Sequence, residues 1–226
     1  MLAAEFAGRL RHSSEDLRRF LDGSLKALNT DCVDIWYLHS PDHTTPYEVT
    51  MQTVNELYKE GKLKRFGLSN YMSWEVAEIV AICRANGYVQ PTVYQGLYDA
   101  MNHNVELELF ACLRRYNIAF YAFNPLGGGF FTGRYRSLQD PVEPGSRFDT
   151  SHFTGKVTRR RYWNEAYFSA LEKVEDIARN LLKHELGNAI IIGASRVKHV
   201  EQNLADLEKG PLAQEVVEAG NYFHRL

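Results

Sequence analysis

The stretch Val33-Asp34-Ile35-Trp36-Tyr37-Leu38-His39-Ser40-Pro41-Asp42 decides how the fold is interpreted. Its first six residues are apolar or aromatic except for Asp34, which predicts a strand over residues 33–38. His39 and Pro41 follow this strand directly. Ligands of α/β sheets bind beyond the carboxyl ends of parallel strands, so His39 is a candidate functional residue. A lone histidine is also commonly a core residue, and the surrounding chain must distinguish the two roles.

Strand-like and helix-like segments alternate on either side of this stretch. The first helix is predicted over residues 13–28, where Ser13 can cap the helix and the apolar side chains, Leu28 included, are expected to be buried. Alternation of apolar strands with helices predicts an α/β protein whose parallel sheet is covered by helices. Further helices are predicted over residues 46–59, 73–84, 105–115, 162–178 and about 197–208, and further strands over residues 65–69, 92–95, 119–123 and 189–192, with a long loop before residue 162.

Two architectures are compatible with this alternation. A (β/α)8 barrel of the TIM type has eight strands and typically about 250 residues, whereas a doubly wound open sheet has fewer strands. Five strands can be identified in the 226 residues, so alternation alone leaves both open. The sequence contains no repeat and no linker, and we expect a single domain over residues 1–226.

Composition excludes several classes of partner. The 26 basic and 28 acidic side chains give a formal net charge of −2, which predicts no attraction to nucleic acid or to an anionic membrane. No apolar run is long enough to span a bilayer. Residues 1–7 are interrupted by Glu5 and have no basic leader, so we expect no secretory signal and a cytoplasmic location.

Metal binding is not predicted either. The three cysteines, at positions 32, 83 and 112, match no metal-ligand spacing and are expected to be free thiols in a reducing compartment. Pro41 interrupts any helix that would place His39 and His43 on one face, and no third ligand is near in sequence.

Five motifs at the ends of predicted strands make the chain resemble the aldo-keto reductases, and most closely their aflatoxin-aldehyde reductase branch. The resemblance extends from about Leu17 to the C-terminus, and it implies reduction of aldehydes and ketones with NADPH on a (β/α)8 barrel. We therefore expect an incomplete barrel with about five of the eight parallel strands. The motifs are Tyr37–Asp42, Gly67–Tyr71, Tyr94–Gly96, Asn124–Gly129, and Gly193–Arg196 continuing to Glu201–Asn203.

The resemblance also assigns residues to the cofactor, and their chemistry suits it. Amide and hydroxyl groups can bind the carboxamide of a nicotinamide, and Phe123 takes the place of a tyrosine that usually stacks on the ring. Glycines allow close approach to a pyrophosphate, although an ordinary surface loop is the simpler interpretation of a glycine run on its own. Residues at the last helix N-terminus would bind the 2′-phosphate. The assigned set is Ser69, Asn70, Gln95, Phe123, Asn124, Pro125, Leu126, Gly127, Gly128, Gly129, Thr132, Gly133, Arg134, Arg147, Ser195, Arg196, His199, Gln202 and Asn203.

His39 is the catalytic residue that the resemblance implies, and it also contacts the substrate carbonyl. Arg161 and Arg225 match positions that bind a substrate carboxylate in this branch, although a tyrosine expected nearby is replaced by Thr158. Arg161 also belongs to a basic run, Lys156 with residues 159–161, that is most simply interpreted as a solvated surface rather than an anion site.

The family's catalytic set is an aspartate, a tyrosine, a lysine and a histidine, and we expect the first three to lie outside this chain. A proton must reach the alkoxide that hydride transfer creates, so activity is expected to be impaired. Residues 179–188 also connect two predicted elements more directly than in the family. Exposed strand edges would favour a homo-oligomer. The alternative is a non-catalytic module that binds NADPH or another protein.

Overall fold

The computed structural model describes residues 11–174 and 189–191. The chain divides into two compact units, which are described separately. Unit 1 comprises Met1–Gly96 and Val105–Phe120, and unit 2 comprises Leu97–Asn104 and Tyr121–Leu226. The single domain expected over residues 1–226 stays a prediction.

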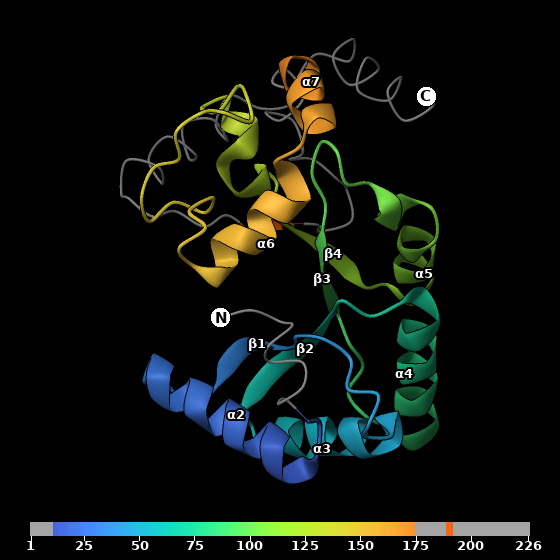
Figure 1. Ribbon diagram of the computed structural model, residues 1–226. Helices are drawn as coiled ribbons and strands as arrows, with labels where there is room; N and C mark the ends of the chain where they lie inside the picture. Colours follow the sequence, from blue (N-terminus) through green and yellow to red (C-terminus); the bar gives the residue numbers. More distant parts are fainter. Residues whose placement is uncertain (1–10, 175–188, 192–226) are drawn as a thin grey trace. The chain divides into compact units, whose positions relative to one another are not determined.

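Unit 1 is a succession of strand–helix pairs (Figure 1). Its helices pack in chain order, α2 against α3, α3 against α4 and α4 against α5. Each helix carries buried apolar residues, and α3 also contacts β2, as expected for helices that cover a parallel sheet. Its elements are α2 (Ser14–Leu28), β1 (Val33–Leu38), α3 (Tyr47–Lys59), β2 (Leu63–Ser69), α4 (Ser73–Asn86), β3 (Val93–Leu97), α5 (Leu109–Tyr116) and β4 (Ala119–Phe123); the last residue of β3 and the last three of β4 belong to unit 2.

Helix α2 shows how local sequence sets these elements. The Ser13 side chain caps the helix by accepting a hydrogen bond from the backbone N–H of Asp16, and Asn29 ends it in the left-handed conformation. Leu17, Leu21 and Leu25 are buried as the spacing predicts. The prediction for Leu28 is wrong, because this residue is 64% exposed in the last turn of the helix.

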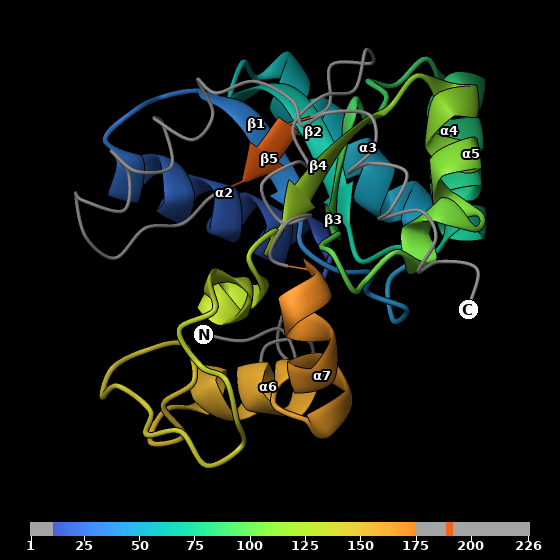
Figure 2. The ribbon, with the colours of Figure 1, turned by 90° about the horizontal axis from the view of Figure 1, so that it is seen from above.

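The described strands follow one another in the sheet in chain order, β1-β2-β3-β4-β5. The pairs β1–β2, β2–β3 and β4–β5 are parallel, and Figure 2 shows β5 (Ala189–Ile191) beside β4. Sequential order is what a barrel of successive β–α units produces, whereas a doubly wound sheet reverses its order at a switch point. The structure thus confirms the α/β class and favours the barrel over the open sheet.

Unit 2 is built around a cluster of aromatic rings. Phe130, Phe131, Tyr135, Phe148 and Tyr162 are buried together and pack against Leu171. The rings meet mostly edge to face, which is the favoured geometry for aromatic pairs. The elements that carry this cluster are the 3-10 turn η2 (Gly127–Thr132) and helices α6 (Phe153–Tyr162) and α7 (Glu165–Val174).

Several boundaries differ from the prediction. The shifts are two residues or fewer at β2, β3 and α4 and larger in the segments that follow. The loop expected before residue 162 contains α6, and the helix expected over residues 162–178 begins at Glu165, with residues 175–178 outside the described part. The helix expected over residues 105–115 is a 3-10 turn, Asn104–Glu106, followed by α5. The helix expected near residues 197–208 lies outside the described residues.

Candidate functional site

The carboxyl ends of the first three strands meet in unit 1. Leu38 of β1 pairs with Leu68 of β2, and Ser69 pairs with Gln95 of β3. His39 follows Leu38 directly, so the register places it near Ser69 and its neighbours. The predicted residues of these strands therefore lie along one edge of the sheet within unit 1.

A hydrogen bond joins two of these predicted residues. The Nδ2 amide of Asn70 donates to the carbonyl oxygen of His39 at 2.8 Å and to the Oγ atom of Ser69 at 3.1 Å. Asn70 can take this position because its φ of 63° lies in the left-handed region, which asparagine tolerates better than most residues. Ser69 is buried, whereas His39 and Asn70 are exposed and can meet a ligand.

A buried carboxylate fixes the loops behind this edge. Glu75 accepts hydrogen bonds from the backbone N–H of Met72 at 2.6 Å and the hydroxyl of Tyr47 at 2.5 Å, and its Oε1 lies 2.7 Å from Nε2 of His43. Burial alone would raise the pKa of Glu75, but the bonds from Tyr47, Met72 and His43 outweigh it and lower the pKa. His43 is thus a partner of Glu75.

In residues 11–174 and 189–191, no three metal-binding side chains gather into a group that could hold a metal ion.

In unit 2, the glycine loop follows β4. Gly127, Gly128 and Gly129 have φ values of 59°, 69° and 100°, a conformation that only glycine adopts readily. A Cβ atom on Gly128 would come within 3.2 Å of Thr158 and 3.6 Å of Arg147, whereas nothing lies within 4 Å of the same position on Gly129. The structure thus places Arg147 beside the glycine loop. Both are assigned to the cofactor by the family resemblance.

Residues on both sides of the glycines hold the loop. Asn124 has a φ of 65°, and its carbonyl oxygen accepts a hydrogen bond from the N–H of Gly127 at 2.8 Å. Pro125 is buried, and Phe123 and Leu126 are half-buried. After the glycines, Thr132 bonds the Gly129 carbonyl through Oγ1 at 2.7 Å, and Gly133 ends η2 in the left-handed conformation.

The predicted arginines have different surroundings. Arg134 forms an ion pair with Glu143, and Arg147 is exposed. Arg161 is exposed on α6, and its role in substrate binding stays a prediction. Arg159 is half-buried and stacks over Trp163 at 4.4 Å, so it departs from the solvated interpretation of this basic run.

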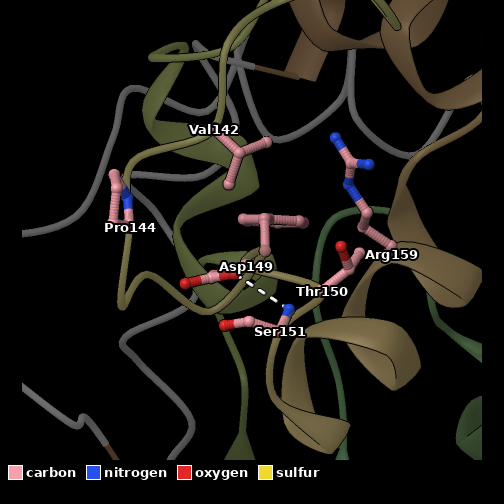
Figure 3. Close-up of a pocket in the computed structure, with 7 residues that line it drawn as sticks. Val142, Pro144, Asp149, Thr150, Ser151 and Arg159 are labelled. Atoms are coloured by element: carbon pink, nitrogen blue, oxygen red, sulfur yellow. Dashed lines mark hydrogen bonds between the residues drawn. The ribbon is translucent and has the colours of Figure 1, made fainter.

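A pocket of about 420 Å³ lies in unit 2 (Figure 3). Phe148 forms part of its wall, and the Nε atom of Arg159 is buried without a hydrogen-bond partner in the part of the chain that is described. The Asp149 carboxylate accepts a hydrogen bond from the Ser151 N–H at 2.9 Å. The pocket thus combines a cation and a carboxylate rather than a single charge. Its lining residues are Val142, Pro144, Phe148, Asp149, Thr150, Ser151 and Arg159.

The remaining predicted residues fall outside the described part of the chain. They are Ser195, Arg196, His199, Gln202, Asn203 and Arg225. Helices within the described ranges are all too short or too polar to cross a membrane.

Sequence reasoning missed two residues that contact the predicted site. The Tyr162 hydroxyl lies between the Asn124 amide, at 3.0 Å, and the Asp99 carboxylate, at 2.8 Å. Asp99 and Tyr162 are 63 positions apart, so no local pattern marks them as a pair. In the sequence, Asp99 is marked only by its place shortly after the predicted strand over residues 92–95.

Comparison with known proteins identifies the family. A model of the aldo/keto reductase family matches residues 8–221. The chain is 44% identical over 225 residues to an aldo-keto reductase of Pseudocercospora fijiensis, 41% over 227 residues to aflatoxin B1 aldehyde reductase member 2 of Mus musculus, and 42% over 229 residues to aldo-keto reductase family 7 member A3 of Homo sapiens. These matches cover 92%, 91% and 92% of the chain but 76%, 62% and 69% of the relatives, so the chain spans only part of their length. The chain belongs to the aldo/keto reductase family, whose fold is the (β/α)8 barrel.

Proposed function

We propose that the chain binds NADPH and acts as an oxidoreductase that reduces aldehydes and ketones to alcohols. Membership of the aldo/keto reductase family supports this class of reaction, and relatives bear the name aflatoxin B1 aldehyde reductase. The observation that carries the proposal is the glycine loop of unit 2, where Arg147 lies beside Gly128.

The glycine loop fits the pyrophosphate of NADPH. Left-handed glycines let the main chain approach an anion without intervening side chains, and the space beside Gly129 is open. The Arg147 guanidinium can bind two phosphate oxygens at once. Arg134 would have to exchange its ion pair with Glu143, so Arg147 is our principal assignment for the phosphate.

Unit 1 supplies groups for the nicotinamide and the carbonyl compound. Asn70 donates its amide N–H to His39, which leaves its Oδ1 atom to accept a hydrogen bond from the carboxamide. Ser69 and Gln95 add a hydroxyl and a second amide along the same strand ends. NADPH, when bound, supplies the hydride. The exposed imidazole of His39 would donate a hydrogen bond to the carbonyl oxygen and orient it.

Turnover by these 226 residues is expected to be slow. The aspartate, tyrosine and lysine of the family set have no assigned equivalents in this sequence, so the alkoxide oxygen would depend on His39 for its proton. Loss of a general acid typically lowers a rate by about 10²- to 10⁴-fold.

Titration of the purified chain with NADPH in a calorimeter tests the cofactor assignment. Arg147→Ala should weaken NADPH binding by about 10-fold or more, because a charge-assisted hydrogen bond is lost. Arg160→Ala, a matched substitution on the exposed face of α6, should leave the affinity unchanged. Equal affinities for all three proteins, or no binding at all, would contradict the assignment.

Turnover is tested with succinic semialdehyde by following the loss of NADPH absorbance. Slow turnover that His39→Ala abolishes would support the reductase. NADPH binding with no turnover would instead support the alternative, a non-catalytic binding module.

Two finer proposals accompany this function. A cytoplasmic location agrees with the three free cysteines, which are typical of a reducing compartment. A homo-oligomer would cover β1, whose Ile35 and Trp36 are half-exposed. Light scattering of the purified chain measures its mass and tests the second proposal.

A further inference from the structure

The hydroxyl of Tyr162 connects the start of the glycine loop to a buried acid. It accepts a hydrogen bond from Nδ2 of Asn124 at 3.0 Å and donates one to Oδ2 of Asp99 at 2.8 Å. Tyr162 and Asp99 are both 0% exposed. Water does not reach the buried Tyr162 side chain, so its hydroxyl depends on Asn124 and Asp99 for its hydrogen-bond partners.

Asp99 sets the direction of the hydrogen bonds. Its Oδ1 atom accepts from the backbone N–H groups of Met101 and Asn102, both at 3.0 Å, and the Asn102 amide lies 2.8 Å from Oδ1 and 2.9 Å from Oδ2. Burial raises the pKa of Asp99, and the bonds from Asn102, Met101 and Tyr162 oppose this rise. Both carboxylate oxygens of Asp99 accept hydrogen bonds from Met101 or Asn102, and the Tyr162 hydroxyl donates its hydrogen to Oδ2. The phenol oxygen must therefore accept from Asn124, which turns the Asn124 Oδ1 atom away from Tyr162.

The ring of Tyr162 holds the other side of the glycine loop. It stacks on Phe130 with centroids 6.2 Å apart and meets Phe131 edge to face at 6.0 Å. Asn124 precedes the three glycines and Phe130 follows them, so one side chain fixes both ends of the loop.

We propose that Tyr162 is a positioning residue for the cofactor: by fixing the Asn124 amide, it presents Asn124 Oδ1 as an acceptor to the nicotinamide half of NADPH. The inference rests on the proposed function, because Asn124 follows Phe123, which is assigned to the nicotinamide ring. The Asn124 amide would contact only the nicotinamide half of NADPH and not the adenosine half. Loss of the Tyr162 hydroxyl should therefore affect the two halves differently.

Tyr162→Phe tests this role, since it removes the hydroxyl and keeps the ring. We expect NADPH binding to weaken by about 5- to 10-fold, the effect of one hydrogen bond, with no change in binding of 2′,5′-ADP, which lacks the nicotinamide half. Asp99 retains the bonds from Met101 and Asn102, so the variant should fold. Tyr135→Phe is the matched control: Tyr135 belongs to the same aromatic cluster, but its hydroxyl is buried without a partner among the described residues.

A double-mutant cycle shows whether Tyr162 acts through Asn124. Asn124→Gly removes the amide and permits the same left-handed backbone. Adding Tyr162→Phe to Asn124→Gly should cause no further loss of NADPH affinity, whereas additive losses would overturn the inference. Equal weakening of NADPH and 2′,5′-ADP would also overturn it, since that is the result of a damaged fold.

The hydrogen bond from the Asn124 amide to the Tyr162 hydroxyl can be tested without cofactor. In the NMR spectrum of the free protein, the Asn124 side-chain amide, identified by its absence in Asn124→Gly, should exchange with water faster in Tyr162→Phe than in the unsubstituted chain. Unchanged exchange would overturn the inference. If the unsubstituted chain does not bind NADPH, the proposed function fails; if it binds and Tyr162→Phe binds equally well, only this inference fails.

Discussion

The side-chain amide of Asn70 donates a 2.8 Å hydrogen bond to the backbone carbonyl of His39, so the residue after β2 holds the residue after β1. This bond keeps the candidate catalytic histidine at the strand end without using its ring. It also explains an asparagine at a position with a φ of 63°, where glycine would be less strained. The hydrogen bond made by the Asn70 side chain, rather than the backbone conformation, accounts for asparagine at this position.

Asn70→Gly should therefore destabilise unit 1 by about 1 kcal/mol, because two side-chain hydrogen bonds are lost while the backbone is relaxed. Asn117→Gly is the control, since Asn117 also has a positive φ but is exposed at the end of α5. It should leave stability unchanged or raise it by a few tenths of a kcal/mol. Urea unfolding of both variants measures the difference, and equal midpoints would show that the Asn70 amide contributes nothing.

A glycine in β2 sets how closely the strand packs. A Cβ atom on Gly67 would lie 2.6 Å from the Tyr37 ring and 2.7 Å from Val93. Gly67→Ala should cost about 1–3 kcal/mol, because the neighbouring side chains on β1 and β3 must move.

Gly23→Ala should stabilise the protein, in contrast to Gly67→Ala. Gly23 lies inside α2 with nothing within 4 Å of the added atom, so alanine should stabilise the helix by about 0.5–1 kcal/mol. Thermal unfolding followed by circular dichroism compares the two variants. A neutral Gly67→Ala would refute the close packing of β1, β2 and β3.

Acid should weaken unit 1. The pKa values of Glu75 and Asp42 are lowered in the folded protein, since hydrogen bonds to each carboxylate outweigh the effect of burial. Each carboxylate therefore stabilises the fold above its unfolded pKa, about 4, and this stability is lost as the pH falls through the lower folded pKa. Urea midpoints should decrease steadily from about pH 5 downwards.

Glu75→Gln separates this effect from general acid sensitivity. The variant should lose about 1–3 kcal/mol at neutral pH and show a shallower decrease on acidification. Glu48→Gln, on the exposed side of α3, should keep the slope of the unsubstituted chain. If Glu75→Gln keeps the full slope, the Glu75 hydrogen bonds are not the cause.

The cysteines should differ in reactivity. Burial raises the pKa of Cys83 to about 12 and also raises the pKa of Cys112, where Glu108 adds to the effect. The thiolate is the reactive form, so a thiol reagent at mildly alkaline pH should modify half-exposed Cys32 first and Cys83 last. Peptide mass mapping over time gives the order, and early labelling of Cys83 would indicate local opening of α4.

Much of the fold can be predicted from local patterns. The apolar runs over residues 33–38 and 119–123 predict β1 and β4 with their observed bounds, because their ends are marked by polar residues and turns. Helix α6 escapes prediction: it has few apolar residues and no side-chain cap. Tertiary contact explains it, since Gly155 lies so close to the Asp149 backbone that no side chain would fit between them.

Some residues of the candidate site can also be predicted from the sequence, and others cannot. Residues at strand ends, such as His39 and Asn70, are found by sequence because a strand places its last residues at one edge of the sheet. Asp99 and Tyr162 are not found, because their hydrogen bond depends on how distant segments pack. The assignment of Arg147 to the cofactor came from family resemblance and not from spacing, and its place beside Gly128 is seen only in the structure.

Trp163 packs between Tyr135 and Phe168, with ring centroids 5.0 Å and 5.3 Å away, and it is the sole tryptophan of unit 2, since Trp36 and Trp74 belong to unit 1. Its fluorescence therefore reports on the aromatic cluster alone once Trp36 and Trp74 are replaced by phenylalanine. The protein carries a built-in optical probe for asking whether its two units melt together or one after the other.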